Sequence, residues 1–327
     1  MNHDVLTCWP AVEFMKNPKN NELPPYLSYE AVTFYRAAVP ITHTIDFGDS
    51  EAVREFRKEV HADWAKITEE IDFSFDLHEE YLGDVRALRI TTDTTRETDK
   101  TIFLLHGGAY VLGTPEVNAS SAILLAQATG IPVLSIDYRL APEHPFPAAL
   151  NDARDAYLSL VESGCKADDI FVVGESAGAG LGVSLCLTLR DLDKVRPGAL
   201  VSLSIWADLE ASGDSLTTLI DSDLDFGNLA ALYDCGYPYA GDNDLSLPLM
   251  SPVNAALHDL PPMLIQVGAR EMLLSDSLRL ASNARDAGVP VDLDVWDGMG
   301  HMFQAIPSLP EATKAHLRIR AFLEKLG

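Results

Sequence analysis

Residues 172–182 read VVGESAGAGLG and follow directly on an apolar run that begins at Ile170. The run predicts a buried strand, and the small residues after Ser176 predict the start of a helix. Between them, GESAG matches the pattern G-x-S-x-G, in which a sharp strand-to-helix turn presents the hydroxyl of the central serine. Glycines at positions 174 and 178 remove side chains that would clash in such a turn. Ordinary glycine-rich turns contain the same pattern, so the rest of the chain has to decide whether Ser176 is a nucleophile.

The composition is that of a globular protein with an acidic surface. The chain has 327 residues, of which 47% are hydrophobic and 22% are charged, and its net charge is −25. This length suffices for one large α/β domain or two small ones. Nucleic acids and anionic membranes are themselves negatively charged, so we expect neither as a partner. No apolar stretch approaches the ~20 residues that a membrane-spanning helix needs.

The first residues and the cysteines predict a cytoplasmic protein. Residues 1–14 contain neither the basic segment nor the long apolar segment of a secretory signal. The four cysteines show no CxxC or Cys/His spacing typical of a metal site; they are Cys8, Cys165, Cys186 and Cys235. We therefore expect thiols in a reducing compartment, and no metal.

Alternating strand and helix patterns predict a mostly parallel, eight-stranded sheet with helices on both faces. Two segments that alternate in polarity flank a Gly83-Asp84 turn, and short apolar runs follow along the chain. The expected strands are 71–77, 85–92, 101–105, 131–136, 170–173, 200–206, 263–267 and 291–296. Helices are expected at 50–67, 116–129, 176–192, 275–287 and 311–326, and a further helix is expected to end at about residue 163. Ser50 is expected to cap the first of them.

Residues 207–260 form a long stretch that is rich in Asp, Gly and Pro. Such a stretch is uncommon in a compact domain unless it has a function of its own, so we predict a lid or cap. The aromatic residues among the first 65 residues are expected to pack against the domain or to roof a pocket.

The residues that serine-dependent acyl transfer requires occur in the order serine, acid, histidine. An acidic residue follows the predicted strand 263–267, and His301 follows the strand 291–296 in a glycine-flanked loop. Sites in open α/β sheets lie where strands end, although a solvated loop histidine also fits this position. After strand 101–105, the HGGA turn exposes backbone N–H groups that suit an oxyanion, as does Ala177. A pair of glycines is otherwise an ordinary tight turn.

Several motifs together resemble the hormone-sensitive-lipase-like (family IV) esterases of the α/β-hydrolase superfamily. Those proteins carry HGGG, DYRLAPEHPFPAA and GDSAGG segments, followed by a late acid and a late histidine. This chain has HGGA at 106–109, DYRLAPEHPFPAA at 137–149, GESAGA at 174–179, EMLLSDS at 271–277 and HMF at 301–303. The resemblance covers residue 70 to the end, and three specific motifs occur in order at suitable spacing.

The resemblance implies an α/β-hydrolase fold and a serine carboxylesterase that acts on small-molecule esters of short-chain acids. It implies Ser176, Glu271 and His301 as catalytic residues, with Gly108, Ala109 and Ala177 as oxyanion donors. Gly107 and Tyr110 are expected to contact the substrate, and no cofactor or metal is implied. Helices in residues 1–65 and an insert at 208–245 are expected to cap a catalytic domain of residues 66–327. Relatives are often dimers, so a homodimer is a candidate state.

Two departures from the family pattern leave questions open. The third glycine of HGGG is Ala109, which keeps its N–H group as a donor if the backbone there does not need a positive φ. The acid segment offers both Glu271 and Asp276; we favour Glu271, because Asp276 stands at a helix start, where a carboxylate is favoured anyway. We interpret Glu175, Asp137 and Arg139 as structural.

The same residues are compatible with other functions. A lactonase or an amidase would use the same Ser176. An aspartate-nucleophile hydrolase is disfavoured because the turn holds serine, and a ligand-binding receptor of this fold is disfavoured because His301 is present.

Overall fold

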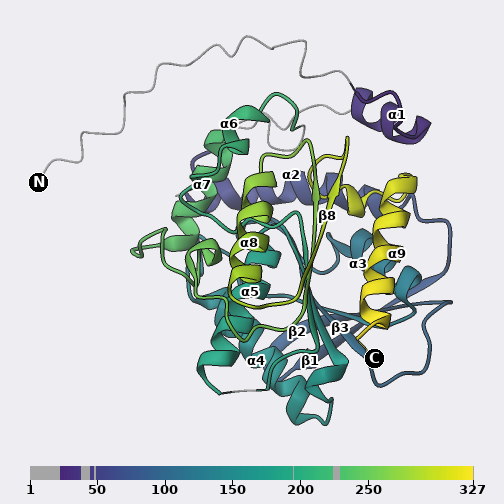
Figure 1. The fold of residues 1–327 in the computed structure, drawn as a ribbon, viewed down its shortest axis with the longest axis vertical. Helices are drawn as coiled ribbons and strands as arrows, with labels where there is room; N and C mark the ends of the chain where they lie inside the picture. The colour runs from purple at the N-terminus through teal and green to yellow at the C-terminus, as the bar shows by residue number, and fades with distance from the viewer. Residues whose placement is uncertain (1–22, 38–44, 48, 194, 224–228, 327) are drawn as a thin grey trace, which may run out of the picture.

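An eight-stranded sheet runs through the computed structural model, which describes residues 23–37, 45–47, 49–193, 195–223 and 229–326 (Figure 1). The strand order is β1-β2-β4-β3-β5-β6-β7-β8. Strand β2 pairs antiparallel with β1 and with β4, and all other neighbouring strands are parallel. The mostly parallel eight-stranded sheet predicted from the sequence is therefore confirmed.

The strands lie close to the predicted segments. They are β1 Phe75–Leu82, β2 Val85–Thr92, β3 Thr101–Leu105, β4 Val133–Ile136, β5 Ile170–Glu175, β6 Ala199–Leu203, β7 Met263–Gly268 and β8 Val291–Trp296. The largest difference is β1, which begins at Phe75 instead of Ile71. Its limits are set by pairing with β2, which runs from Phe75 opposite Thr92 to Leu82 opposite Val85 across the predicted Gly83-Asp84 turn.

Helices cover both faces of the sheet (Figure 1). Helices α3 (Ala119–Thr129) and α9 (Pro310–Glu324) cover one face, and α4 (Ala148–Glu162), α5 (Ala177–Asp191) and α8 (Leu274–Asp286) cover the other. Successive residues of a strand point to opposite faces, so β3 contributes to both cores. Phe103 and Leu105 pack on the side of α4 and α5, whereas Ile102 and Leu104 pack on the side of α3 and α9.

Helix α2 (Ser50–Thr68) crosses the molecule beyond the carboxyl ends of the parallel strands (Figure 1). Its apolar residues Val53, Phe56 and Val60 recur at the period of a helix and are buried. The cap prediction was wrong by one residue, because Asp49 rather than Ser50 accepts the N–H groups of residues 51 and 52. Asp49 has the extended backbone that a cap position requires, whereas Ser50 already belongs to the helix.

The remaining helices are α1 (Tyr29–Ala37), α6 (Ser215–Thr218) and α7 (Leu229–Ala240). Together with α2 they lie at the same end of the sheet (Figure 1). Residues 1–22, 38–44, 48 and 224–228 of the predicted cap segments lie outside the described residues.

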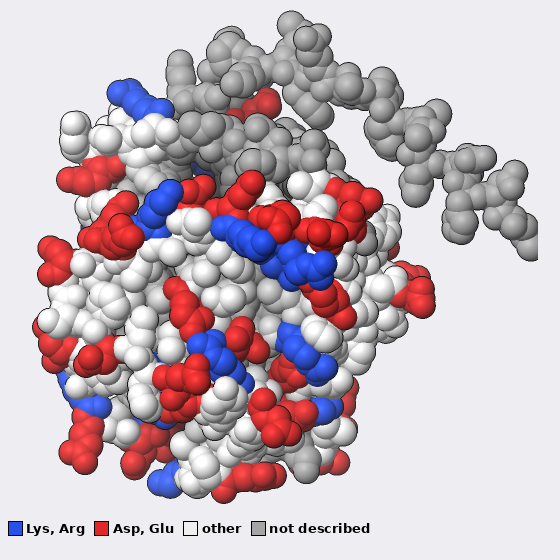
Figure 2. Space-filling view, turned by 180° about the vertical axis from the view of Figure 1, so that it is seen from behind, with Lys and Arg blue, Asp and Glu red and all other residues white. Residues whose placement is uncertain are grey.

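The acidic side chains are distributed over the surface. Figure 2 shows Asp and Glu scattered across the described part of one face, with Lys and Arg beside many of them. None of the helices within the described ranges combines the length and the hydrophobicity that crossing a bilayer requires.

Candidate active site

Ser176 occupies the turn between β5 and α5, with φ +52° and ψ −116°. An L-residue rarely adopts this backbone conformation, and such strain is concentrated at functional sites. The flanking glycines are required by close approach of the backbone. A Cβ at Gly174 would lie 2.4 Å from the carbonyl oxygen of Gly178, and a Cβ at Gly178 would lie 2.1 Å from that of Leu105. The sharp turn predicted from GESAG is therefore present.

Glu271 and His301 are in contact. Nδ1 of His301 lies 2.6 Å from Oε2 of Glu271, and the Glu271 side chain is completely buried. The other carboxyl oxygen accepts hydrogen bonds from the N–H of Gly268 at 2.5 Å and from the hydroxyl of Ser204 at 3.0 Å. Burial raises the pKa of Glu271, and these two donors oppose the rise. The contact fixes which imidazole nitrogen faces the carboxyl group and leaves Nε2 for another partner.

Asp276, the alternative acid, has other partners. Its Oδ2 accepts the N–H groups of Ala207 and Asp208, at 2.8 and 2.9 Å, and so anchors the chain that follows β6. Burial raises the pKa of Asp276 to about 8, and the nearby Asp208 acts in the same direction. Asp276 is thus a buried anchor of the first turn of α8 and does not contact His301.

The turn after β3, residues 107–113, is called the donor loop here because its backbone exposes N–H groups. Gly108 has φ +125°, and a Cβ there would lie 2.2 Å from the carbonyl oxygen of Leu112, so only glycine fits. Ala109 has φ +52°. The backbone therefore does adopt a positive φ at this position, a conformation that costs alanine about 1–2 kcal/mol. Within the described residues, the N–H groups of Gly108, Ala109 and Ala177 have no hydrogen-bond acceptor.

Gly107 and Glu175 connect this loop to the serine turn. The N–H of Gly107 donates to Oε2 of Glu175 at 3.4 Å, and burial raises the pKa of that carboxyl group to about 7. Glu175 is the last, buried residue of β5 and directly precedes Ser176. This contact agrees with the structural role expected for Glu175. The other two residues expected to be structural form ion pairs, Asp137 with Arg86 and Arg139 with Asp152.

Tyr110 does not lie where the sequence predicted. Its side chain is 1% exposed and stacks on the ring of Tyr239, with ring centroids 3.6 Å apart. It is not among the residues that line the cavity described below. With φ +64°, the backbone directs the side chain into the core beside Trp206 rather than toward the loop's open side. The expectation that Tyr110 contacts the substrate is therefore not retained.

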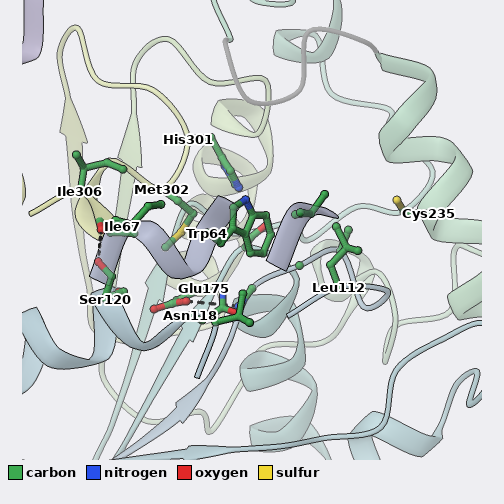
Figure 3. A pocket seen from close by; sticks show the side chains of 18 of the residues that line it. Trp64, Ile67, Leu112, Asn118, Ser120, Glu175, Cys235, His301, Met302 and Ile306 are labelled. Carbon is green, nitrogen blue, oxygen red and sulfur yellow. Dashed lines mark hydrogen bonds between the residues drawn. The ribbon is translucent and has the colours of Figure 1, made fainter. Parts of the chain in front are cut away.

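A cavity of about 210 Å³ brings the serine, the histidine and the donor loop together. Ser176, His301, Gly107, Gly108 and Ala109 all line it. Figure 3 shows His301 at one side of the cavity with its ring directed inward, opposite Glu175 and Asn118. The cavity is large enough for a small organic molecule, and Ser176, His301 and the donor loop share its lining.

Most of the cavity wall is apolar, and much of it comes from residues 34–67, whose aromatic side chains were expected either to pack against the domain or to roof a pocket. The apolar lining residues are Phe34, Phe47, Phe56, Val60, Trp64, Ile67, Leu112, Val117, Met302, Ala305 and Ile306. The apolar period of α2 was visible in the sequence, but it does not distinguish a helix that covers a cavity from one that covers a filled core.

Helix α2 is attached to the donor loop by two polar side chains. Arg57 donates to the carbonyl oxygens of Val111 and Ala141 and forms a two-pronged ion pair with Glu143. One turn further along, Nε2 of His61 accepts the N–H of Gly113 at 2.9 Å. Burial lowers the pKa of His61, which keeps this nitrogen an acceptor.

No cluster of three or more His, Cys, Asp or Glu side chains in the described part of the chain is arranged to hold a metal ion. Cys165 and Cys186 carry free thiols, and Cys235 lines the cavity.

The chain is similar to known esterases in sequence and in structure. The family of the alpha/beta hydrolase fold matches residues 102–305. An acetyl-hydrolase of Streptomyces hygroscopicus is 40% identical over 70% of this chain and 76% of its own length. An esterase of Acinetobacter venetianus is 35% identical over 69% of this chain and 75% of its own.

Two crystal structures extend the similarity to the whole fold. An esterase of the bacterial hormone-sensitive lipase family is 35% identical, with a TM-score of 0.82 over 92% of this chain and 99% of its own. Esterase E25 is 29% identical, with a TM-score of 0.86 over 93% of this chain and 95% of its own. The chain belongs to the α/β-hydrolase family and, within it, to the hormone-sensitive-lipase-like (family IV) carboxylesterases, enzymes that act on carboxylic esters.

Proposed function

We propose that this enzyme is a serine carboxylesterase in which Ser176 is the nucleophile, His301 the base and Glu271 the acid that orients the base. The observation that carries the proposal is the 2.6 Å contact between Glu271 and His301 beside a cavity that Ser176 also lines. The strained backbone at Ser176 and the unpaired N–H groups around it support the same assignment.

The reaction follows from the position of each group. Nδ1 of His301 faces Glu271, so Nε2 is the atom that takes the proton of Ser176 Oγ as the oxygen attacks the ester carbonyl carbon. The N–H groups of Gly108, Ala109 and Ala177 stabilise the negative oxygen of the tetrahedral intermediate. His301 then gives the proton to the leaving alcohol, and an acyl-enzyme remains. Water then attacks the acyl-enzyme with His301 again as the base, and the carboxylic acid is released. These steps need no cofactor or metal.

We further propose that residues 1–65, with α1 and most of α2, and the insert at about 208–245, with α7, form a cap over the rest of a catalytic domain of residues 66–327. The cavity wall supports this division. Phe34 comes from α1, Trp64 comes from α2, and Cys235 comes from α7. The opposite wall, with Ser176 and the donor loop, belongs to the catalytic domain. Substrate size would then depend chiefly on residues of the cap.

Labelling with a fluorophosphonate separates this proposal from a receptor function. The reagent modifies a serine only when a base activates it, so we expect one label at Ser176 and loss of esterase activity in parallel. A protein that leaves Ser176 unlabelled would be a binding protein of this fold. A lactonase or amidase would label as well, and comparing kcat/KM for esters, lactones and amides distinguishes those activities.

We expect kcat/KM to rise with pH through one ionisation near about pH 6.5, the ordinary pKa of histidine. Protonated His301 cannot accept the proton of Ser176, so the rate falls as the pH is lowered. The two groups titrate as a pair, and both the burial of Glu271 and its charge favour a proton on the pair.

The measurement is hydrolysis of p-nitrophenyl acetate between about pH 5 and 8, the range in which histidine titrates, corrected for the reaction without enzyme. A profile that stays flat across this range contradicts the role of His301 as base.

The methyl group of Ala109 is expected to restrict the alcohol part of the substrate. Ala109 lines the cavity and replaces the glycine that relatives have beside the oxyanion. A methyl-sized change in a pocket is worth ~1–3 kcal/mol, or about 10–200-fold in relative rate. We predict good activity on short-chain esters of primary alcohols and weak activity on esters of tertiary alcohols. Ala109→Gly should raise the tertiary-to-primary ratio, because glycine adopts φ +52° without strain and the loop keeps its shape.

The measurement is kcat/KM for ethyl acetate and tert-butyl acetate in both proteins. Equal rates for the two esters in the unmodified enzyme contradict the prediction.

A further inference from the structure

The loop that carries His301 has little regular structure of its own. Strand β8 ends at Trp296, and the short 3₁₀ turn that follows begins at Phe303. Two residues between them, Gly298 and Met302, have positive φ values of 76° and 49°. The position of the imidazole therefore depends on what holds the backbone of this loop from outside.

Two hydroxyl groups hold the peptide N–H groups on either side of His301. The N–H of Gly300 donates to the hydroxyl of Tyr35 at 2.7 Å, and the N–H of Met302 donates to the hydroxyl of Ser204 at 3.1 Å. Tyr35 belongs to α1, and Ser204 directly follows β6. Both partners are thus far from the loop in sequence and come from two different elements.

Ser204 connects the acid to the base. While it accepts the N–H of Met302, its own hydroxyl proton goes to Oε1 of Glu271 at 3.0 Å. Ser204 is completely buried, and its N–H donates to the carbonyl oxygen of Gln266 in β7 at 2.8 Å. The sheet therefore fixes Ser204, and Ser204 fixes Glu271 relative to the backbone next to His301.

Tyr35 connects α1 to the base. The chain before α1 lies on the same loop, since the hydroxyl of Tyr26 donates to Asp297 and a Cβ at Gly298 would lie 2.5 Å from Leu27. The hydroxyl of Ser28 donates to Glu311 at the start of α9 at 2.8 Å, which anchors this segment on the catalytic domain. The hydroxyl of Tyr35 is the contact of this segment that lies next to His301.

We propose that Tyr35 and Ser204 are positioning residues. Their hydroxyl groups accept the peptide N–H groups before and after His301 and so hold its imidazole at the position where it can reach Ser176. This proposal rests on the function of Ser176 and His301 proposed above. It implies that α1 contributes to catalysis through Tyr35 and not only to the wall of the cavity.

The first test removes the Tyr35 hydroxyl and keeps its ring. For Tyr35→Phe we expect kcat to fall about tenfold with KM unchanged, because a misplacement of about 1 Å can cost up to 10²-fold in rate. Tyr29→Phe on the same helix is the matched control and should leave both constants unchanged, since Tyr29 is 81% exposed. A rise in KM with unchanged kcat would mean that Tyr35 only shapes the cavity and would overturn the proposal.

The second test examines Ser204. For Ser204→Ala we expect a loss of kcat at least as large as that of Tyr35→Phe, because Glu271 loses a hydrogen-bond donor as well. Alanine keeps the Cβ of serine, so the backbone conformation at this position is equally accessible to it. Ser202→Ala is the matched control on β6, because it removes the hydroxyl of another buried serine, 1% exposed, two residues before Ser204. Unchanged kcat in Ser204→Ala would overturn its role.

The decisive test repeats both changes in a His301→Ala background. A residue that acts through the imidazole has nothing to position there, so neither Tyr35→Phe nor Ser204→Ala should lower the residual rate further. A further loss of the same size would mean a general structural role and would overturn the proposal. If His301→Ala and Ser176→Ala retained full activity, the proposed catalytic residues themselves would be wrong. If those two variants are inactive but Tyr35→Phe is fully active, only the present inference fails.

Discussion

Ser176→Ala is expected to lower kcat by about 10⁴-fold or more, because nucleophile and base act as a unit and the loss of either removes the acyl-enzyme route. The remaining rate should be that of the oxyanion donors and of substrate binding alone. The fold should be unaffected, since alanine keeps the Cβ of serine and faces the same φ of +52° at the turn.

The measurement is turnover of p-nitrophenyl acetate by the purified variant, with thermal unfolding recorded in parallel. Fluorophosphonate labelling should disappear together with activity. If the folded variant retains turnover close to that of the unmodified enzyme, a different group carries the reaction and the proposed mechanism is wrong.

Glu271→Gln is expected to cost about 10⁴-fold in kcat, as the loss of the orienting carboxylate does in the serine protease that serves as the template for this chemistry. The reason is the position of the amide. Oε1 still accepts the N–H of Gly268 and the hydroxyl of Ser204, so the NH₂ group faces Nδ1 of His301. Nδ1 then has to accept, the proton moves to Nε2, and the imidazole is in the wrong tautomer to serve as base.

Asp276→Asn is the matched control, because it makes the same chemical change five residues away in an equally buried carboxyl group. An asparagine oxygen still accepts the N–H groups of Ala207 and Asp208, so we expect kcat to fall by less than about tenfold, with the main effect on stability. The pair of variants is compared by kcat on one ester and by thermal unfolding. If Asp276→Asn is the more damaging change to kcat, the role of the acid moves to Asp276.

Much of the fold follows from local sequence patterns. The apolar runs of β3 and β5 indicated buried parallel strands, and both strands are buried along their whole length. Glycines at positions 174 and 178 indicated the turn around Ser176, because only a residue without a side chain permits such close approach of the backbone. These patterns act over a few residues, so one sequence is enough to detect them.

Boundaries and caps were less predictable. Strand β1 is limited by its pairing with β2, and helix α2 begins at the residue whose backbone leaves the extended region. Both depend on free-energy differences between neighbouring residues that are small compared with the packing of whole elements.

The order of strands and helices along the sequence indicated the fold class. Residues adjacent in the chain indicated the serine turn, the HGGA turn and the loop that holds His301. Only the tertiary structure decided which acid meets His301, since Glu271 and Asp276 are five residues apart and the direction of each side chain depends on packing. The same holds for Tyr110, which stacks on Tyr239 in the core, and for Tyr35 and Ser204, which meet the His301 loop. Contacts between distant segments have no local sequence pattern, because they form only when the sheet brings those segments to one end.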